Sequence, residues 1–411
     1  MNGFLRERSA VVRYVWFKLT PAGWHLVGVG VIAGTVGSAS IRHPVYMVFM
    51  MLFCLGALAA LVNLCHRPRL RVRAQAPERA VAGQPVRFDV RVTNTGRMPA
   101  YDLSAGFLLL PSGLDESAAP TLRRLAPGAS AALSVEVTPV RRGVYALPPL
   151  RVFSTFPFHF TRSGNTRADV GALLVQPAFH PVHDVRVPVA ARYQPGGVSL
   201  TSNVGESPEY IGNREFRPGD SMRHIDFRAW ARLTQPAVRE YQEEYYCRLA
   251  LVLDTFVPRK RRLPKAGFED LEAAVSLAAS AADALSRGEY LIDIFAAGPD
   301  LYVFRAGRHT AHLDNILEIL ACVDACRSNP FERVTPALTE QLHNISAVIC
   351  VFLDWDEDRA HLVRAAEEAG CEVKVFVVGR RAPDAAMAAA LPADGQCFTP
   401  AAVRAGGIDT L

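Results

Sequence analysis

The chain is 411 residues long and 50% hydrophobic, with a formal net charge of +5. Because a chain of this length is longer than one that typically folds around a single hydrophobic core, several domains are expected. The charge is modest and comes without basic–aromatic interleaving or a nucleic-acid motif, so nucleic acid is not expected as a partner.

Two uncharged apolar runs, 24–41 and 45–65, stand near the start of the chain. At about 1.5 Å per residue, each is long enough to cross a bilayer. Arginine and lysine flank the outer ends of both runs, whereas Arg42 is alone in the turn between them. The positive-inside rule therefore predicts a transmembrane hairpin, with the 1–23 segment and the soluble domains in the cytoplasm. A cleaved signal peptide is the alternative, and the second run argues against it.

Residues 66–180 change to short alternating runs such as 86–92, which turn signals at 82–83 and 95–96 bound. Alternation with a period of two is typical of half-buried strands. We therefore expect an all-β sandwich of immunoglobulin-like architecture.

The segment 181–246 carries the densest charge of the chain. Between 206 and 244, six arginines alternate with eight carboxylates. Alternating signs favour a paired network over a solvated block of like charge. The run 218–220, Pro-Gly-Asp, indicates a turn between two extended arms. The predicted signature network comprises Glu209, Arg214, Pro218, Gly219, Asp220, Arg223, Asp226, Arg232, Tyr241 and Glu244.

The string 214–220, with Arg223 and Asp226 after it, resembles the signature of the bacterial family catalogued as domain of unknown function 58. The chain departs from that family at Phe227, which is usually tryptophan, and at Trp230, which is usually a small residue. The resemblance implies the bacterial inner membrane and a C-terminal domain like that of von Willebrand factor A.

From 247 to 380, apolar runs alternate with helical patterns. Strands are expected at 249–254, 291–295, 301–304, 347–354 and 373–378, and helices at 268–287, 313–325 and 357–369. Such alternation is typical of a largely parallel, doubly wound sheet, whose ligand edge lies at the carboxyl ends of the strands. Residues 381–411 are expected to form a C-terminal tail.

Two of these strands end in an aspartate, Asp254 and Asp354, an order that resembles the von Willebrand factor A domain. Metal-binding members of that family hold Mg²⁺ with Asp-x-Ser-x-Ser, a threonine and a later aspartate. The motif here reads DTFVP over 254–258, so both serine oxygens are missing and no cofactor is expected. Asp254 and Asp354 remain as a degenerate candidate site for Mg²⁺, with Thr335 or Thr339 as a further ligand.

A strongly basic loop follows the first of these strands and contains Arg259, Lys260, Arg261 and Arg262. A solvated loop is one interpretation. The other is a partner-binding surface for an acidic protein or anionic lipid.

The sequence has no nucleophile elbow, phosphate loop or metalloprotease motif, so catalysis is not expected. We expect a membrane-anchored scaffold or adaptor, in which the paired charges of the signature join the β domain to the α/β domain. The family resemblance implies a MoxR-type AAA+ ATPase as partner, in complex assembly or envelope maintenance. The alternatives are a membrane-tethered hydrolase that uses Asp220, Asp226, His224 and nearby arginines, and a metal-dependent adhesion domain.

Overall fold

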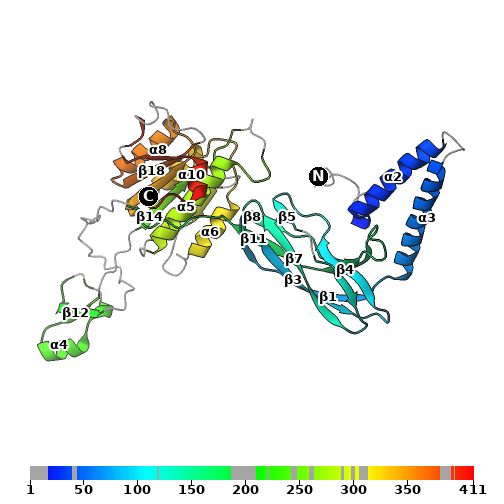
Figure 1. Ribbon diagram of the computed structural model, residues 1–411. Coiled ribbons are helices and arrows are strands. Elements are labelled where there is room, and N and C mark those ends of the chain that lie inside the picture. The colour runs from blue at the N-terminus through cyan, green and yellow to red at the C-terminus, as the bar shows by residue number, and fades with distance from the viewer. Residues whose placement is uncertain are drawn as a thin grey trace. The chain divides into compact units, whose positions relative to one another are not determined.

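The structure is a computed structural model of the chain. It describes residues 17–38, 44–117, 120–186, 210–218, 220, 222–241, 248–258, 263–287, 291–297, 301–304, 313–379, 390–392 and 394–411. The chain divides into two compact units, and Figure 1 shows the helices and strands of both. The first contains residues 1–178, 260–272 and 317–323, and the second contains the remainder.

Two helices, α2 (Pro21–Ser38) and α3 (Pro44–Cys65), begin the first unit. They lie side by side, and an added Cβ at Gly34 would meet the Phe49 ring at 3.1 Å. Among the described residues, only α3 is long and apolar enough to cross a membrane. The prediction of two spans is therefore supported for one helix, because five glycines and His25 make α2 less apolar.

Both outer ends of this helix pair contact the loop around residue 160 in the same unit. The Thr20 backbone N–H donates to the Phe160 carbonyl at 3.0 Å. The Asn63 amide, near the end of α3, donates to the Thr161 carbonyl at 3.5 Å. The start of α2 and the end of α3 therefore lie at the same end of the pair.

Three β-sheets follow in the first unit and share one core. Their strand orders are β1-β3-β7-β5, β10-β9-β4-β6 and β2-β11-β8. The strands are β1 (Leu70–Gln75), β2 (Arg79–Val81), β3 (Val86–Asn94), β4 (Ala100–Phe107), β5 (Leu114–Glu116), β6 (Leu122–Leu125), β7 (Ser130–Pro139), β8 (Gly143–Ala146), β9 (Leu150–Ser154), β10 (Ser163–Ala168) and β11 (Ala172–Gln176). Alternate residues of β3, such as Phe88 and Val90, point into the core that Leu103 and Leu173 also line. The period-two pattern of the sequence thus produces this buried face.

The second unit contains a six-stranded sheet of order β16-β15-β14-β17-β18-β19. Its strands are β14 (Arg248–Leu253), β15 (Leu291–Ala297), β16 (Leu301–Phe304), β17 (Ala347–Phe352), β18 (Glu372–Val378) and β19 (Gln396–Phe398). The edge strand β16 is antiparallel to β15, and the other pairs are parallel. The predicted mixed α/β composition is confirmed.

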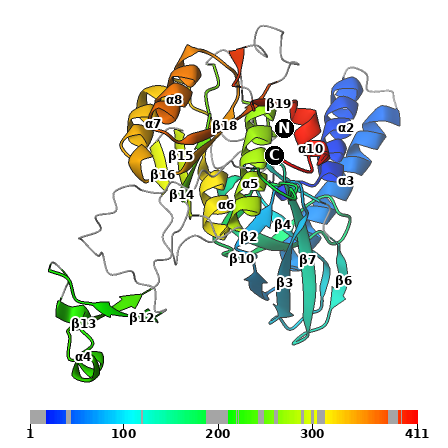
Figure 2. The same cartoon turned by 90° about the vertical axis from the view of Figure 1, so that its left-hand side faces the viewer.

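The central strands β14 and β17 are buried almost throughout, as expected for a parallel sheet covered on both faces. The helices of this half of the chain are α5 (Glu269–Ser286), α6 (Leu313–Cys322), α7 (Phe331–Thr339), α8 (Glu357–Glu368) and α10 (Pro400–Ala405), with a 3₁₀ turn, η3, at Leu342–Asn344. The first four residues of α5 and residues 317–322 of α6 are assigned to the first unit. Figure 2 shows α7 and α8 on one side of the sheet. Their apolar residues share a core with Val252, Cys350 and Phe352 from alternate positions of β14 and β17.

Three elements of the second unit differ from the sequence-based expectation. Helix α7 lies in a stretch with no predicted element, and both β19 and α10 lie in the expected C-terminal tail. Each is nine residues or shorter. Short elements show too few periods for a pattern to identify them, and their pairing depends on the sheet already present.

Candidate functional site

The family-like signature forms a hairpin of β12 (Tyr210–Glu215) and β13 (Ala237–Tyr241), with a 3₁₀ turn, η2 (Met222–His224), and helix α4 (Phe227–Leu233) between the strands. The strands are antiparallel, with Arg214 opposite Val238. The Asp220 N–H donates to the Arg217 carbonyl at 3.0 Å and closes the turn that Pro218 begins. Pro218 therefore lies at the second position of a turn, as the Pro-Gly-Asp run of the sequence indicates.

Arg214 and Asp220 form a two-pronged ion pair across this turn. Both guanidinium N–H groups of Arg214 donate to the carboxylate, each at 2.7 Å. The Arg217 backbone N–H donates to the same carboxylate at 2.8 Å. The hydrogen bonds from Arg214, aided by that amide, lower the pKa of Asp220 from 3.8 to about 2. Asp220 is consequently ionised at neutral pH.

Asp226 caps the start of α4 and holds it to the strands. Its carboxylate accepts the N–H groups of Arg228 and Ala229 at 3.0 and 3.1 Å. It also accepts bonds from the Arg239 guanidinium and the Asn213 amide, both at 3.3 Å. Led by the Ala229 amide, these donors lower the pKa of Asp226. This carboxylate is therefore also held in its charged form.

The remaining members of the predicted network are placed as follows. Pro218, Arg223 and Arg232 are exposed, and Tyr241 ends β13. Glu209, Gly219 and Glu244 lie outside the described residues. The side chains of Arg214 and Asp220 are 35% and 14% exposed. The ion pairs Arg214–Asp220 and Arg239–Asp226 both lie within the hairpin. The predicted role of the signature as a joint between domains stays a prediction.

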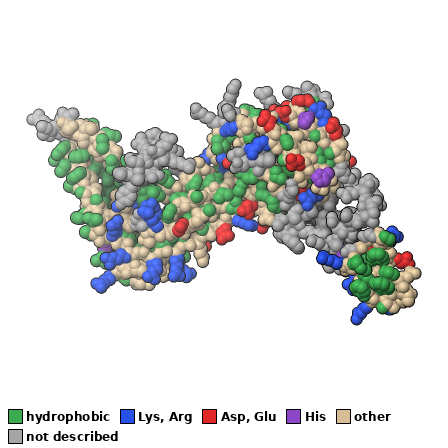
Figure 3. Space-filling view, turned by 180° about the vertical axis from the view of Figure 1, so that it is seen from behind, with side chains coloured by type: hydrophobic (Ala, Val, Ile, Leu, Met, Phe, Trp, Pro, Cys, Tyr) green, Lys and Arg blue, Asp and Glu red, His purple; other side chains and the backbone are tan. Residues whose placement is uncertain are grey.

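An exposed aromatic face on the hairpin was missed by the sequence reasoning. Phe227 and Trp230 are 67% and 37% exposed, and their rings stack with centroids 6.1 Å apart. Met222 and Leu233 of the same hairpin are also exposed. Figure 3 shows hydrophobic side chains gathered on this lobe. Phe227 and Trp230 are also the two positions at which the chain departs from the family signature. That departure is the sequence signal that could have identified the aromatic face.

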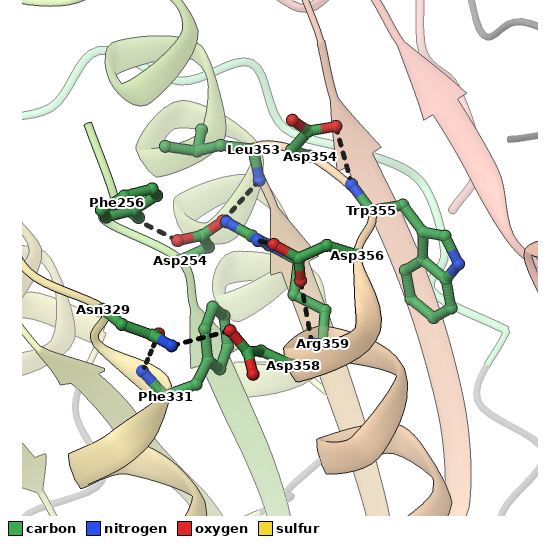
Figure 4. A network of polar contacts seen from close by, with 10 residues as sticks. All are labelled: Asp254, Phe256, Asn329, Phe331, Leu353, Asp354, Trp355, Asp356, Asp358 and Arg359. Atoms are coloured by element: carbon green, nitrogen blue, oxygen red, sulfur yellow. Dashed lines mark hydrogen bonds and ion pairs between the residues drawn. The ribbon is translucent and has the colours of Figure 1, made fainter. Parts of the chain in front are cut away.

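The second candidate site lies where β14 and β17 end, in the second unit (Figure 4). Asp254 is fully buried there. Its Oδ1 accepts the Phe256 N–H and its Oδ2 accepts the Leu353 N–H, both at 2.9 Å. The Arg359 guanidinium, from α8, donates to Oδ2 through Nε and Nη2 at 2.9 and 2.6 Å. An arginine therefore neutralises the acid that ends β14.

The other candidate metal ligands do not complete a cation site. Asp354 accepts the Trp355 N–H at 2.9 Å. Thr335 and Thr339 lie on α7, where the Thr339 hydroxyl donates to the Thr335 carbonyl at 2.8 Å. Within the described ranges, no group of three His, Cys, Asp or Glu could hold a metal ion. Since the guanidinium lies against the Asp254 oxygens, the residues do not fit Mg²⁺, which requires several free oxygen donors.

The basic loop of Arg259, Lys260, Arg261 and Arg262 lies outside the described residues. The segment that leads into it is anchored. The Val257 N–H donates to the Cys326 carbonyl at 2.9 Å, and the Arg327 guanidinium donates to the Pro258 carbonyl at 3.0 Å. The loop therefore starts from a held position after β14, and its predicted contact with a partner stays a prediction.

Comparison with known proteins gives one family match. The model of the family described as "Protein of unknown function DUF58" matches residues 212–396. This range contains most of the signature hairpin and both strand-end aspartates. The comparison with curated proteins found no match.

Several solved structures show weak likeness. The CARDB domain of a Pyrococcus furiosus protein is 16% identical over 27% of this chain and 94% of that chain, with a TM-score of 0.20. A protein of unknown function from Porphyromonas gingivalis W83 is 18% identical over 28% and 52%, with a TM-score of 0.19. A GH20 exo-β-N-acetylglucosaminidase from Vibrio harveyi is 8% identical over 75% and 57%, with a TM-score of 0.15. At these TM-scores the likenesses carry no argument about fold or function.

Proposed function

We propose that this chain, whose residues 212–396 match the model of the family described as Protein of unknown function DUF58, is a membrane-anchored scaffold or adaptor that binds another protein. The observation that carries the proposal is the exposed pair Phe227 and Trp230 on the signature hairpin. Exposed aromatic side chains on a rigid support are typical anchors of protein interfaces. Exposed arginines, including Arg228 and Arg232, flank the pair and suit an acidic partner.

The electrostatics of the hairpin favour binding over acid–base catalysis. A general acid or base is most effective when its pKa lies near the working pH. The pKa of Asp220 is lowered to about 2, and that of Asp226 is lowered as well. Both carboxylates accept hydrogen bonds that hold the hairpin together. These facts support a structural role for the two acids and a contact role for the face that they hold.

The partner that we propose is a MoxR-type AAA+ ATPase, and the process is complex assembly or envelope maintenance. This choice comes from the family resemblance alone. The order and parallel pairing of the six-stranded sheet support a von Willebrand factor A-like domain for the second unit. The shared core of the three sheets in the first unit supports an immunoglobulin-like sandwich.

We propose the bacterial inner membrane as the location, with both helices inserted and the soluble units in the cytoplasm. Helix α2 exposes Val31, Ile32 and Val36, and α3 exposes Met47 and Met51. Apolar side chains in such numbers on a helix surface favour a lipid environment. The common position of both outer helix ends supports a hairpin.

The test is affinity purification of the tagged chain from native membranes, with and without ATP, followed by mass spectrometry. We expect an AAA+ ATPase to co-purify with the parent chain. The double variant Phe227→Ser, Trp230→Ser should lose it, because the aromatic anchors are gone. The control Met98→Ser removes an apolar side chain of the first unit that is 62% exposed, and it should keep the partner. Retention of the partner by the double variant contradicts the assignment of this face.

A further inference from the structure

The carboxyl edge of the parallel sheet contains a buried carboxyl group whose charged form requires compensation, because burial raises the pKa of Asp254 and Arg359 opposes that rise. Asp254 is fully buried at the end of β14, and an unpaired buried carboxylate is strongly unfavourable. In a doubly wound sheet this edge is where ligands and ions usually bind. The compensating group here belongs to the chain itself, since the guanidinium of Arg359 contacts Asp254 from α8.

Arg359 is held from several directions. Its side chain is 3% exposed, and it forms a second ion pair with Asp356, the N-cap residue of α8. The guanidinium lies over the Phe331 ring, 4.9 Å from its centroid. Burial opposes the charge of Arg359, but the carboxylates of Asp254 and Asp356 outweigh it and raise the pKa of the guanidinium. The arginine therefore remains charged.

This cluster connects three segments that are distant in sequence. The segment after β14 joins it because the Phe256 backbone N–H donates to the Asp254 carboxylate. The segment before α7 joins it because Asn329 accepts the Phe331 N–H at 3.0 Å and donates to Asp358 at 2.7 Å. The segment after β17 joins it through the Leu353 N–H. Figure 4 shows these side chains converging from the three segments.

We propose that Arg359 is a built-in cation, which replaces a divalent metal ion at this edge and locks the three segments in one metal-independent arrangement. A metal ion would need the Asp254 oxygens that the guanidinium and two backbone N–H groups already use. The positive charge within 2.6 Å of Oδ2 would also repel it. The basic loop that starts after residue 258 therefore begins at a site which is preorganised without a ligand.

The test compares Arg359→Met with Arg364→Met in the full chain in detergent. Arg364 lies on the same helix, but its ion pair with Glu357 is exposed, so its loss should change little. Arg359→Met leaves the buried Asp254 carboxylate without a cation and should raise the opening equilibrium constant of β14 and β17 roughly a hundredfold or more. Hydrogen–deuterium exchange of the amides in these strands measures that constant. Equal exchange in the two variants overturns the proposal.

Two further measurements keep the inference testable if Arg359→Met does not fold. The double variant Asp254→Asn, Arg359→Met removes both charges of the central pair and should fold with slower exchange than Arg359→Met. No gain over the single variant overturns the pairing. In the parent chain, strand exchange should be the same in EDTA and in Mn²⁺. Protection by Mn²⁺ that Asp254→Asn abolishes would show a metal site and refute the built-in cation.

Discussion

At the scale of single residues, two Arg–Asp pairs use the same chemistry in different surroundings. Arg214 and Asp220 pair on the partly exposed hairpin, whereas the Arg359 and Asp254 side chains are only 3% and 0% exposed. Solvent screens the first pair, so removal of one partner should cost little. The second pair is shielded, so the loss of its cation alone should be severe.

The lowered pKa of Asp220 predicts a pH dependence of the hairpin. A carboxylate whose pKa falls from 3.8 to about 2 on folding stabilises the folded form above pH 3.8 and loses that effect as the pH falls towards 2. The NMR shift of the Arg217 amide, which donates to Asp220, should follow this titration in the full chain. Asp220→Asn should abolish the transition. A midpoint at the ordinary aspartate pKa would contradict the ion pair.

At the scale of elements, β17 connects the core of the second unit to the strand-end site. Phe352, its last residue, is fully buried and packs edge to face on Phe331 with ring centroids 5.7 Å apart. Phe331 in turn supports the guanidinium of Arg359. Packing of the strand end and placement of the charge cluster are therefore linked.

Phe352→Ala should destabilise the second unit by about 3–5 kcal/mol, because it leaves a cavity between β17 and α7. Urea unfolding of the full chain in detergent, followed by tryptophan fluorescence, measures the change, since Trp355 lies beside this ring. The matched control Val303→Ala truncates an exposed side chain on the edge strand β16 and should have little effect. Similar losses in both variants would show that the strand end is not packed as described.

At the scale of the whole molecule, the proposed insertion of the helix pair would decide on which side of a membrane the rest of the chain lies. If both α2 and α3 cross, the chain between them lies on the opposite side from both outer ends. We expect an alkaline phosphatase fusion after residue 41 to be active in the periplasm and a fusion after residue 66 to be inactive. An active fusion after 66 would mean a single crossing by α3 and would reverse the predicted location.

The sequence by itself determined the features that depend on neighbouring residues. The apolar run that forms α3, the alternation in β3, the buried runs of β14 and β17 and the turn at Pro218 all follow from local side-chain patterns. The family signature was also readable, because a run of specific residues identifies it without any structure.

Only the tertiary structure decided which of these features meet. Arg359 and Asp254 are 105 positions apart, and no local pattern relates them. The sequence showed that two metal ligands are missing after Asp254. The cation that we propose in place of the metal ion, the Arg359 guanidinium, comes from helix α8. The exposure of Phe227 and Trp230, and the addition of β19 to the sheet, likewise depend on the surrounding packing. Local propensity specifies elements, whereas burial and charge pairing are properties of the assembled chain.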